Sequence, residues 1–232
     1  MLPPDQPEAR GAAAAGARLQ TPREELLNAV SHGFGLLLAL ASLPILVAIA
    51  ARQGTAATVV GAVLFSSTMA VLYFASTVYH ALPHGAWKRR FNRLDHASIY
   101  LFIAGSYMPF TLGPLRGPWG WSLFGVVWGI AAVGTLAKLL NRLRHPLWST
   151  GLYVGMGWIA LVAVPPMIER IGARGLMLLV AGGVAYTVGA LFFLLDGRYR
   201  YAHFVWHLFV LSGSTLHFLA VALYAVTTGP MA

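Results

Sequence analysis

Long apolar runs separated by short basic connections dominate the chain. Seven runs contain no Asp, Glu, Lys or Arg, and they cover residues 26–51, 53–87, 97–115, 117–137, 145–168, 175–195 and 201–232. Each run can cross a bilayer as an α-helix, which needs about 20 mainly apolar residues. Because a helix satisfies its own backbone hydrogen bonds, the two longest runs are expected to hold helices at about residues 55–80 and 203–226. The pattern predicts an all-α integral membrane protein with a seven-transmembrane-helix bundle.

The basic residues lie mostly on one side of the predicted bundle. Twelve of the 16 Lys and Arg residues precede the first run or follow the second, fourth and sixth runs, whereas four lie in the connections on the other side. Basic connections stay in the cytoplasm, so the N-terminus is expected in the cytoplasm and the C-terminus outside, in a multi-pass protein of the inner (plasma) membrane. This topology accounts for the net charge of +9, and no nucleic-acid partner is expected.

Composition narrows the class of protein further. Hydrophobic residues make up 58% of the chain and charged residues 10%, with a mean hydropathy of +0.68, and these values exclude a water-soluble globule. Residues 1–22 are rich in Ala, Gly and Pro and are expected to form a disordered cytoplasmic tail, followed by one membrane domain at residues 23–228. The chain has no cysteine, so a metal site would have to use His, Asp or Glu.

Three histidines are expected at one depth of the bundle. The last run opens with His203 and His207, and a spacing of four places both imidazoles on one helix face, about 6 Å apart along the axis. The helix expected at about residues 55–80 ends at the cytoplasmic side with His80. Three neutral imidazoles and a water form the usual open zinc site of a hydrolase. The alternative is that the paired histidines only hydrogen-bond to neighbouring helices.

Two further polar residues are expected beside these histidines. Asp95 stands directly before the third run and is the only acidic residue between Glu25 and Glu169, so it is the candidate general base that handles the proton of the water. Ser76 lies one turn from His80 on the same helix face and is suited to orient a ligand or the substrate oxygen. The alternative for Asp95 is an interfacial charge paired with a nearby arginine, Arg93 or Arg90.

His32 belongs to a polar stripe on the first run. Glu24, Asn28 and His32 follow one another at intervals of four and therefore share a helix face. The stripe begins at the cytoplasmic surface, where the other histidines are expected. His32 either lines a cavity shared with these histidines or has a packing and hydrogen-bonding role, and the sequence does not separate the two.

Several short motifs occur together in an order that is typical of one family. They are Glu24-x3-Asn28-x2-Ser31-His32, Ser76-x3-His80, Asp95 followed by Gly105-Ser106-Tyr107-Met108-Pro109, and His203-x3-His207. With these motifs, the chain from about residue 21 to 226 resembles the hemolysin III family, the bacterial branch of the progestin and adipoQ receptor (PAQR) superfamily. The resemblance implies seven helices around a Zn²⁺ ion near the cytoplasmic side. It also implies that His80, His203 and His207 bind the ion, with Asp95 and Ser76 beside its water.

The resemblance leaves three functions open. The alkaline ceramidases are similar to distant relatives of the family and imply zinc-dependent hydrolysis of a lipid amide, with a membrane lipid as substrate or ligand. The hemolysin name implies a pore-forming protein, for instance a homo-oligomer, that causes cytolysis. The third function is a receptor-like membrane-homeostasis protein with structural zinc. We favour the hydrolase, since the spans contain no interior charged residues of the kind that mark ion pathways.

Overall fold

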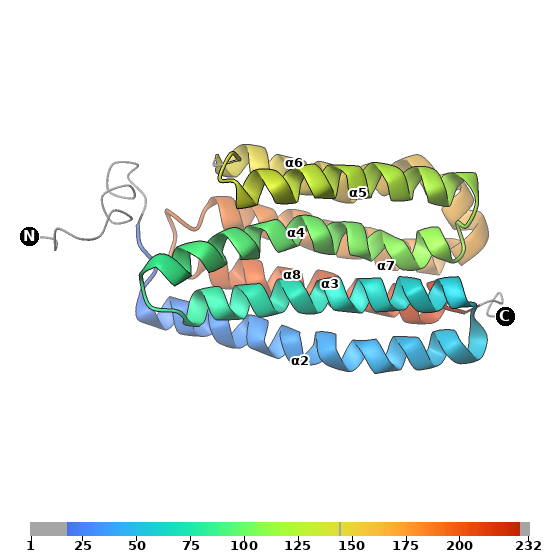
Figure 1. Ribbon diagram of the computed structural model, residues 1–232, viewed down its shortest axis with the longest axis horizontal. Helices are drawn as coiled ribbons and strands as arrows, with labels where there is room; N and C mark the ends of the chain where they lie inside the picture. Colours follow the sequence, from blue (N-terminus) through green and yellow to red (C-terminus); the bar gives the residue numbers. More distant parts are fainter. Residues whose placement is uncertain (1–17, 144, 228–232) are drawn as a thin grey trace, which may run out of the picture.

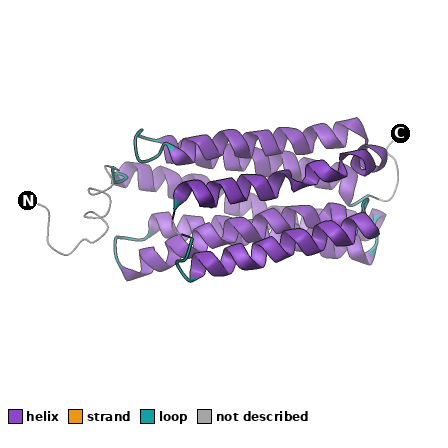
Figure 2. Ribbon diagram, turned by 90° about the horizontal axis from the view of Figure 1, so that it is seen from above, coloured by secondary structure: helices purple, strands orange, loops and turns teal. Residues whose placement is uncertain are grey.

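The computed structural model describes residues 18–143 and 145–227, and every regular element among them is helical. The helices run side by side as an elongated bundle (Figures 1 and 2), in which α2 begins at one end and η2 finishes at the other. In chain order they are α2 (Pro22–Gln53), α3 (Ala56–Ala81), α4 (Ala86–Leu112), α5 (Pro118–Leu139), α6 (Pro146–Trp158), the 3-10 helix η1 (Ile159–Ala163), α7 (Val164–Leu194), α8 (Ala202–Ala220) and the π-helix η2 (Val221–Ala225).

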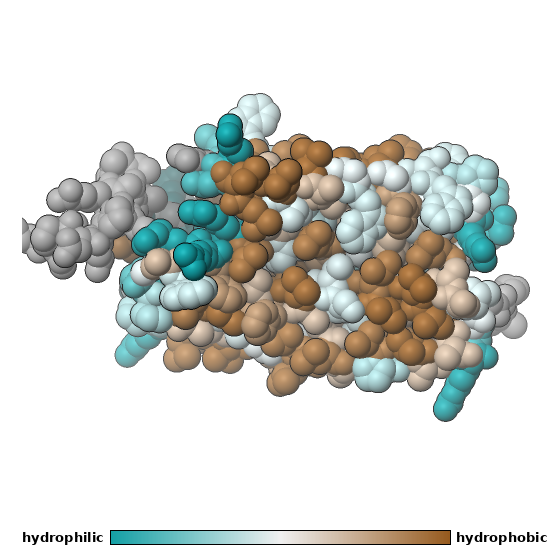
Figure 3. Space-filling model, in the orientation of Figure 1, coloured by the Kyte–Doolittle hydropathy of each residue, from teal (hydrophilic) through white to brown (hydrophobic). Residues whose placement is uncertain are grey.

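Most of the bundle surface is apolar. Five helical segments are long and apolar enough to cross a membrane, namely Pro22–Gln53, Ala56–Ala81, Pro118–Leu139, Pro146–Leu194 and Ala202–Ala225. Figure 3 shows hydrophobic residues across the middle of one face and hydrophilic residues gathered towards the two ends. Large apolar side chains such as Leu37 and Val133 are 65% and 71% exposed. Soluble monomers rarely expose so continuous an apolar surface, so the chain is an all-helical, multi-pass membrane protein.

The helix α4 is less apolar than these five segments, although the sequence predicts a span at residues 97–115. Basic residues occupy its first turns, and several of its later polar residues, among them Asp95 and Ser98, are buried. α4 packs against α3 and α5 and lies between them in Figure 1. A helix surrounded by protein can carry polar side chains that a helix facing lipid cannot. This central position lets α4 bring Asp95 into the interior.

The 49-residue segment Pro146–Leu194 folds back on itself at Gly172. Trp158 Nε1 donates a hydrogen bond of 3.0 Å to Thr187 Oγ1, although the two residues are 29 positions apart. One continuous helix would separate them by about 43 Å. Gly172 lies midway between them with φ 68° and ψ 173°, a conformation that only glycine adopts readily. The runs at residues 145–168 and 175–195 therefore pack against each other on either side of this turn.

Substituting Gly172 should test the turn. Gly172→Ala should lower the free energy of unfolding by about 1–3 kcal/mol, because a side chain disfavours this positive φ, and the melting temperature in detergent should fall accordingly. Gly151→Ala is the matched control, since a Cβ added at either position meets no heavy atom within 4 Å and Gly151 is helical. Equal melting temperatures for both variants would contradict a conformational requirement at Gly172.

Threonine caps fix where the first two helices begin. Thr21 and Glu24 form a reciprocal capping box at the start of α2, and Pro22 stands at the first helical positions. Thr55 and Thr58 form the equivalent pair at the start of α3. Along α3, Gly61 lies so close to α4 that an added Cβ would stand 2.9 Å from the backbone of Pro109. Such close approach of small residues is a common way to lock membrane helices together, and here it holds α3 and α4 side by side.

Candidate metal centre

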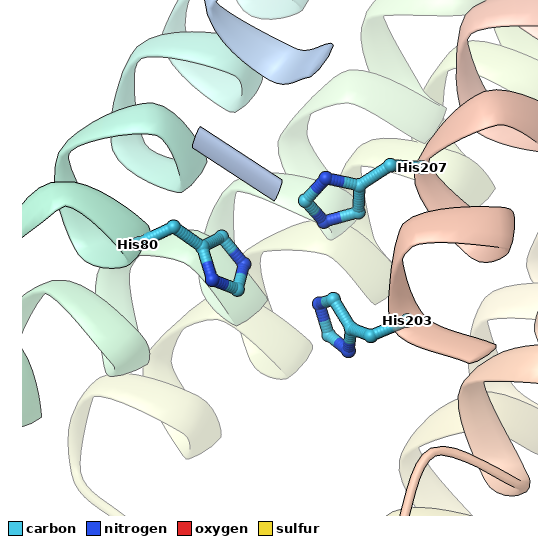
Figure 4. Close-up of side chains that lie close together, drawn as sticks. All are labelled: His80, His203 and His207. Carbon is cyan, nitrogen blue, oxygen red and sulfur yellow. The ribbon is translucent and has the colours of Figure 1, made fainter. Parts of the chain in front are cut away.

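Three imidazoles converge between the last turn of α3 and the first turns of α8. His80 comes from α3, and His203 and His207 come from α8 (Figure 4). All three are buried, and one nitrogen from each lies within 4.8 Å of the other two. The helical spacing of four places His203 and His207 on one face, as the sequence indicates. The structure thus brings together the three predicted histidines in a cluster that could hold a metal ion.

The Nδ1 nitrogen of His80 is occupied by an acidic partner from α2. His80 Nδ1 lies 2.7 Å from Glu25 Oε2, and the other oxygen of Glu25 lies 3.1 Å from Lys88 Nζ. Lys88 is buried and also donates to the carbonyl oxygens of Tyr79, at 2.9 Å, and Leu82, at 3.1 Å. The lysine therefore caps the end of α3 and neutralises the carboxylate that orients His80.

The two histidines of α8 are held in the same manner. His203 Nδ1 lies 2.8 Å from Asp196 Oδ2, in the connection between α7 and α8. His207 Nδ1 lies 3.2 Å from the carbonyl oxygen of Asn28 and 3.1 Å from Ser31 Oγ, both on α2. Each Nδ1 thus faces a protein oxygen, and a neutral imidazole that donates from Nδ1 keeps a free lone pair on Nε2.

This arrangement fits a metal ion. Histidines that bind metals usually donate their second N–H to a carboxylate or a backbone carbonyl, which fixes the tautomer and the ring orientation. His80 Nε2 is buried and has no hydrogen-bond partner among the described residues. An unpartnered buried lone pair is costly, and coordination of an ion would satisfy it. The donor set of three imidazole nitrogens suits several divalent transition metals.

Glu25 is the partner whose loss should be easiest to measure. Glu25→Gln keeps the shape of the side chain but removes the charge that orients His80, so the affinity for the metal should fall about 10- to 100-fold. Competition against a chromophoric chelator measures the change. Glu169→Gln, an exposed acid of α7 close to the turn at Gly172, is the matched control. An unchanged affinity in Glu25→Gln would show that the carboxylate does not support the ligand.

A short segment before α2 ties the site to the connection that leads into α8. Glu24 is buried, pairs with Arg18 and accepts hydrogen bonds from the backbone N–H groups of Thr21 and Tyr201 at 2.9 and 2.8 Å. Arg18 in turn donates from its backbone N–H to the carbonyl of Gly197. The hydrogen bond with Glu24 raises the pKa of Arg18, so the guanidinium remains protonated. Of the expected tail, residues 18–21 thus contact the bundle, and residues 1–17 lie outside the described residues.

Ser76, Asp95 and His32 lie beside the cluster and line one cavity with His203 and His207. Ser76 Oγ lies 2.7 Å from His32 Nδ1, and the Asp95 side chain is a close neighbour of Ser76 in the same cavity. The imidazole of His32 stacks flat on that of His207, with ring centroids 3.4 Å apart and an interplanar angle of 7°. His32 therefore does both things that the sequence leaves open: it lines the cavity, and it forms a hydrogen bond with Ser76.

Asp95 is not paired with the arginines that follow α3. Among the ion pairs of the described residues, none joins Asp95 to Arg90 or Arg93, and Asp95 as a residue is only 9% exposed. Its polar neighbour is Ser76. The alternative of an ion pair with Arg90 or Arg93 is therefore wrong, because α4 turns the Asp95 side chain into the bundle.

The cavity has one polar end and a long apolar remainder. Its volume is about 180 Å³. Beyond the cluster it is lined mainly by apolar side chains, such as Phe102 and Phe110 of α4 and Leu176 and Leu179 of α7. Asp95 and Thr111 both line it and are 16 positions apart on α4, so it extends about 24 Å along the bundle. These dimensions suit a single extended hydrocarbon chain with its polar group at the histidines.

Sequence reasoning missed Glu25 and Asp196 as partners of the ligand histidines. The sequence offers one signal for such partners, which is that acidic residues are rare: the chain contains only seven. Glu24, Glu25, Asp95 and Asp196 all lie at the histidine end of the bundle. Acids concentrated at the end of a membrane bundle where basic residues also gather are good candidates for buried pairs.

Comparison with known proteins identifies the family of this chain. A family model described as haemolysin-III related matches residues 20–218. The chain is 42% identical to a protein named hemolysin-3 from Bacillus cereus, over 90% of this chain and 95% of that protein. It is 39% identical to a hemolysin-3 homolog from Bacillus subtilis (strain 168), over 89% and 96% of the two chains. It is also 31% identical to the human monocyte to macrophage differentiation factor, over 69% and 68%. The chain therefore belongs to the haemolysin-III related family, within the PAQR group of membrane proteins.

Proposed function

We propose that this protein is a zinc-dependent hydrolase that cleaves an amide bond in a membrane lipid. The observation that carries the proposal is the position of the three-histidine cluster at the polar end of a long apolar cavity. A lipid chain in the cavity would bring its carbonyl group to the histidines. A purely structural metal site would not need a ligand-sized apolar space beside it.

His80, His203 and His207 would hold the zinc ion through Nε2. Three histidines are the protein ligands of many catalytic zinc sites, where the bound ion polarises a carbonyl oxygen and makes a water acidic enough to lose its proton near neutral pH. Glu25 and Asp196 would keep His80 and His203 in the required tautomer, since each accepts from Nδ1.

Asp95 and Ser76 would act on the reacting groups. The Asp95 carboxylate would accept a proton from the attacking water and return it to the leaving amine. The Ser76 hydroxyl, a neighbour of Asp95, would orient that carboxylate. The apolar cavity lining would bind the acyl chain and keep bulk water away from the reaction.

Topology forms part of the proposal. We infer seven crossings, with the N-terminus in the cytoplasm and the site near the cytoplasmic face of the inner membrane. The reversal at Gly172 supports an odd number of crossings, and so does the start of α2 at the end of the bundle opposite to η2. The chain has no cysteine, so single cysteines are informative. An impermeant maleimide on intact cells should label Arg116→Cys and spare Arg142→Cys, and the reverse pattern would overturn the orientation.

The hydrolase is tested by metal analysis and a lipid screen on the detergent-purified chain. Mass spectrometry should find about one zinc per chain, and incubation with N-acyl sphingosines and N-acyl ethanolamines should release free fatty acid. Zinc without release from any lipid amide would favour a structural role. The name of the Bacillus cereus relative points to lysis instead, which leakage of a dye from liposomes would detect. Leakage that does not depend on zinc would replace the hydrolase by a pore.

A further inference from the structure

His32 makes contacts at the site that the proposed mechanism does not use. It comes from α2, is 3% exposed, and lines the cavity together with Ser76 and Asp95. Its Nδ1 lies 2.7 Å from Ser76 Oγ. Its ring stacks on His207 and meets the edge of Tyr73, with centroids 5.0 Å apart. These contacts hold the imidazole on two sides, so its orientation is fixed before any ligand arrives.

The hydrogen bonds of Ser76 determine the tautomer of His32. A serine hydroxyl has one proton to donate, and Ser76 lies between the Asp95 carboxylate and His32 Nδ1. The carboxylate is the stronger acceptor, because charge-assisted hydrogen bonds are about twice as strong as neutral ones. We therefore expect the hydroxyl proton of Ser76 to turn towards the Asp95 carboxylate, and His32 Nδ1–H to donate to Ser76 Oγ. In a neutral imidazole this leaves Nε2 without a proton, as an acceptor.

That acceptor has nothing to accept from within the protein. His32 Nε2 is buried and has no hydrogen-bond partner among the residues that the structure describes. A buried acceptor without a donor costs about 1–3 kcal/mol, so a ligand that supplies a donor here gains affinity that other ligands do not. Two groups in the proposed reaction offer such a donor, the attacking water and the N–H of the amide being cleaved, and only the second belongs to the lipid.

We propose that His32 Nε2 accepts a hydrogen bond from the amide N–H of the bound lipid. The site would then select secondary amides over esters and over N-alkylated amides, which have no N–H beside the carbonyl. This inference rests on the proposed function, because it assumes that the carbonyl lies at the three histidines. It adds a substrate-binding residue to α2 and limits the substrate to N-acyl lipids.

Binding of three matched lipids tests the inference without relying on turnover. The probes are N-hexadecanoyl ethanolamine, its N-methyl derivative, and the ester formed by hexadecanoic acid and ethylene glycol. Trp158 and Trp206 line the cavity, so quenching of tryptophan fluorescence in the first seconds after mixing reports binding to the full-length, zinc-loaded protein. We expect the secondary amide to bind about tenfold or more tightly than either analogue.

Two variants locate the preference at His32. His32→Asn keeps an amide N–H close to the Nδ1 position, so it retains a donor for Ser76 but loses Nε2. It should bind all three probes alike while keeping zinc. His32→Gln, whose longer side chain places an amide oxygen closer to the Nε2 position, should recover part of the preference. Zinc content and melting temperature show whether each variant is folded.

The outcomes separate this inference from the hydrolase itself. A preference for the secondary amide that disappears in His32→Asn supports the role of His32, even if no probe is hydrolysed. Such a preference without hydrolysis would contradict only the hydrolase. Equal affinities in the wild type, or an unchanged preference in folded His32→Asn, would overturn the role of His32. Failure of the wild type to bind any of the three probes would overturn both.

Discussion

His207→Ala should yield a folded protein that retains almost no metal after purification. His207 is 1% exposed and contributes one of the three clustered nitrogens. Loss of a direct ligand should weaken the metal affinity by more than the 10- to 100-fold that is typical for loss of a hydrogen-bonding partner of a ligand. The imidazole also stacks on His32, so its removal leaves a cavity, and the melting temperature should fall as well. Mass spectrometry of the detergent-purified variant measures the metal.

His217→Ala is the matched control for this variant. His217 lies on the same helix, ten positions further along and therefore about 15 Å from His207 along the axis. It also lines the cavity, and its Nε2 contacts the carbonyl oxygen of Leu179 at 3.2 Å. Its loss should disturb packing and leave the metal in place. Metal retained in His207→Ala, or lost equally from both variants, would rule out the three-histidine site.

Asp95→Asn should keep the metal and lose most of the turnover. The substitution preserves the shape of the side chain, but an amide cannot accept the proton of the attacking water. Positioned proton transfer contributes typically about 10²- to 10⁴-fold to a rate, so the rate of fatty acid release at saturating lipid amide should fall by about that factor. Metal content measured on the same sample should match that of the wild type.

Ser106→Ala serves as the control for Asp95. Ser106 lines the same cavity on the same helix, three turns further along, and its hydroxyl bonds only the backbone carbonyl of Ile103. Removing this hydroxyl should change the rate little. If Asp95→Asn hydrolyses the lipid as fast as the wild type does, Asp95 does not handle the proton and the mechanism fails. If Asp95→Asn instead loses its metal, the residue supports the ion rather than the reaction.

The parts of this protein that could be predicted from sequence are those that depend on local spacing. The absence of charged residues from long runs predicts the helices, and the interval of four between His203 and His207 places both imidazoles on one face. The alternating direction of successive spans places His80 at the same depth. The family resemblance points to the same three histidines, and the comparisons confirm the family.

Other features depend on how helices distant in sequence rotate against one another. Glu24 and Glu25 are neighbours in sequence, yet Glu24 bonds Tyr201 and Glu25 bonds His80, because adjacent positions on a helix point about 100° apart. The stacking of His32 on His207 joins α2 to α8. No spacing rule within one helix predicts such pairs, so the distinction between the two acids required the packed structure.

The order in which the helices are synthesised determines when the contacts of Glu25 with Lys88 and His80 can form. These three residues lie on α2, α3 and α4, so this half of the site can assemble while the rest of the polypeptide is still being made. His203 and His207 come from α8, near the end of translation. A chain that stops before residue 203 keeps one of the three imidazoles and cannot close the cluster. Capture of an ion between α3 and α8 would thus be restricted to molecules whose membrane insertion is complete.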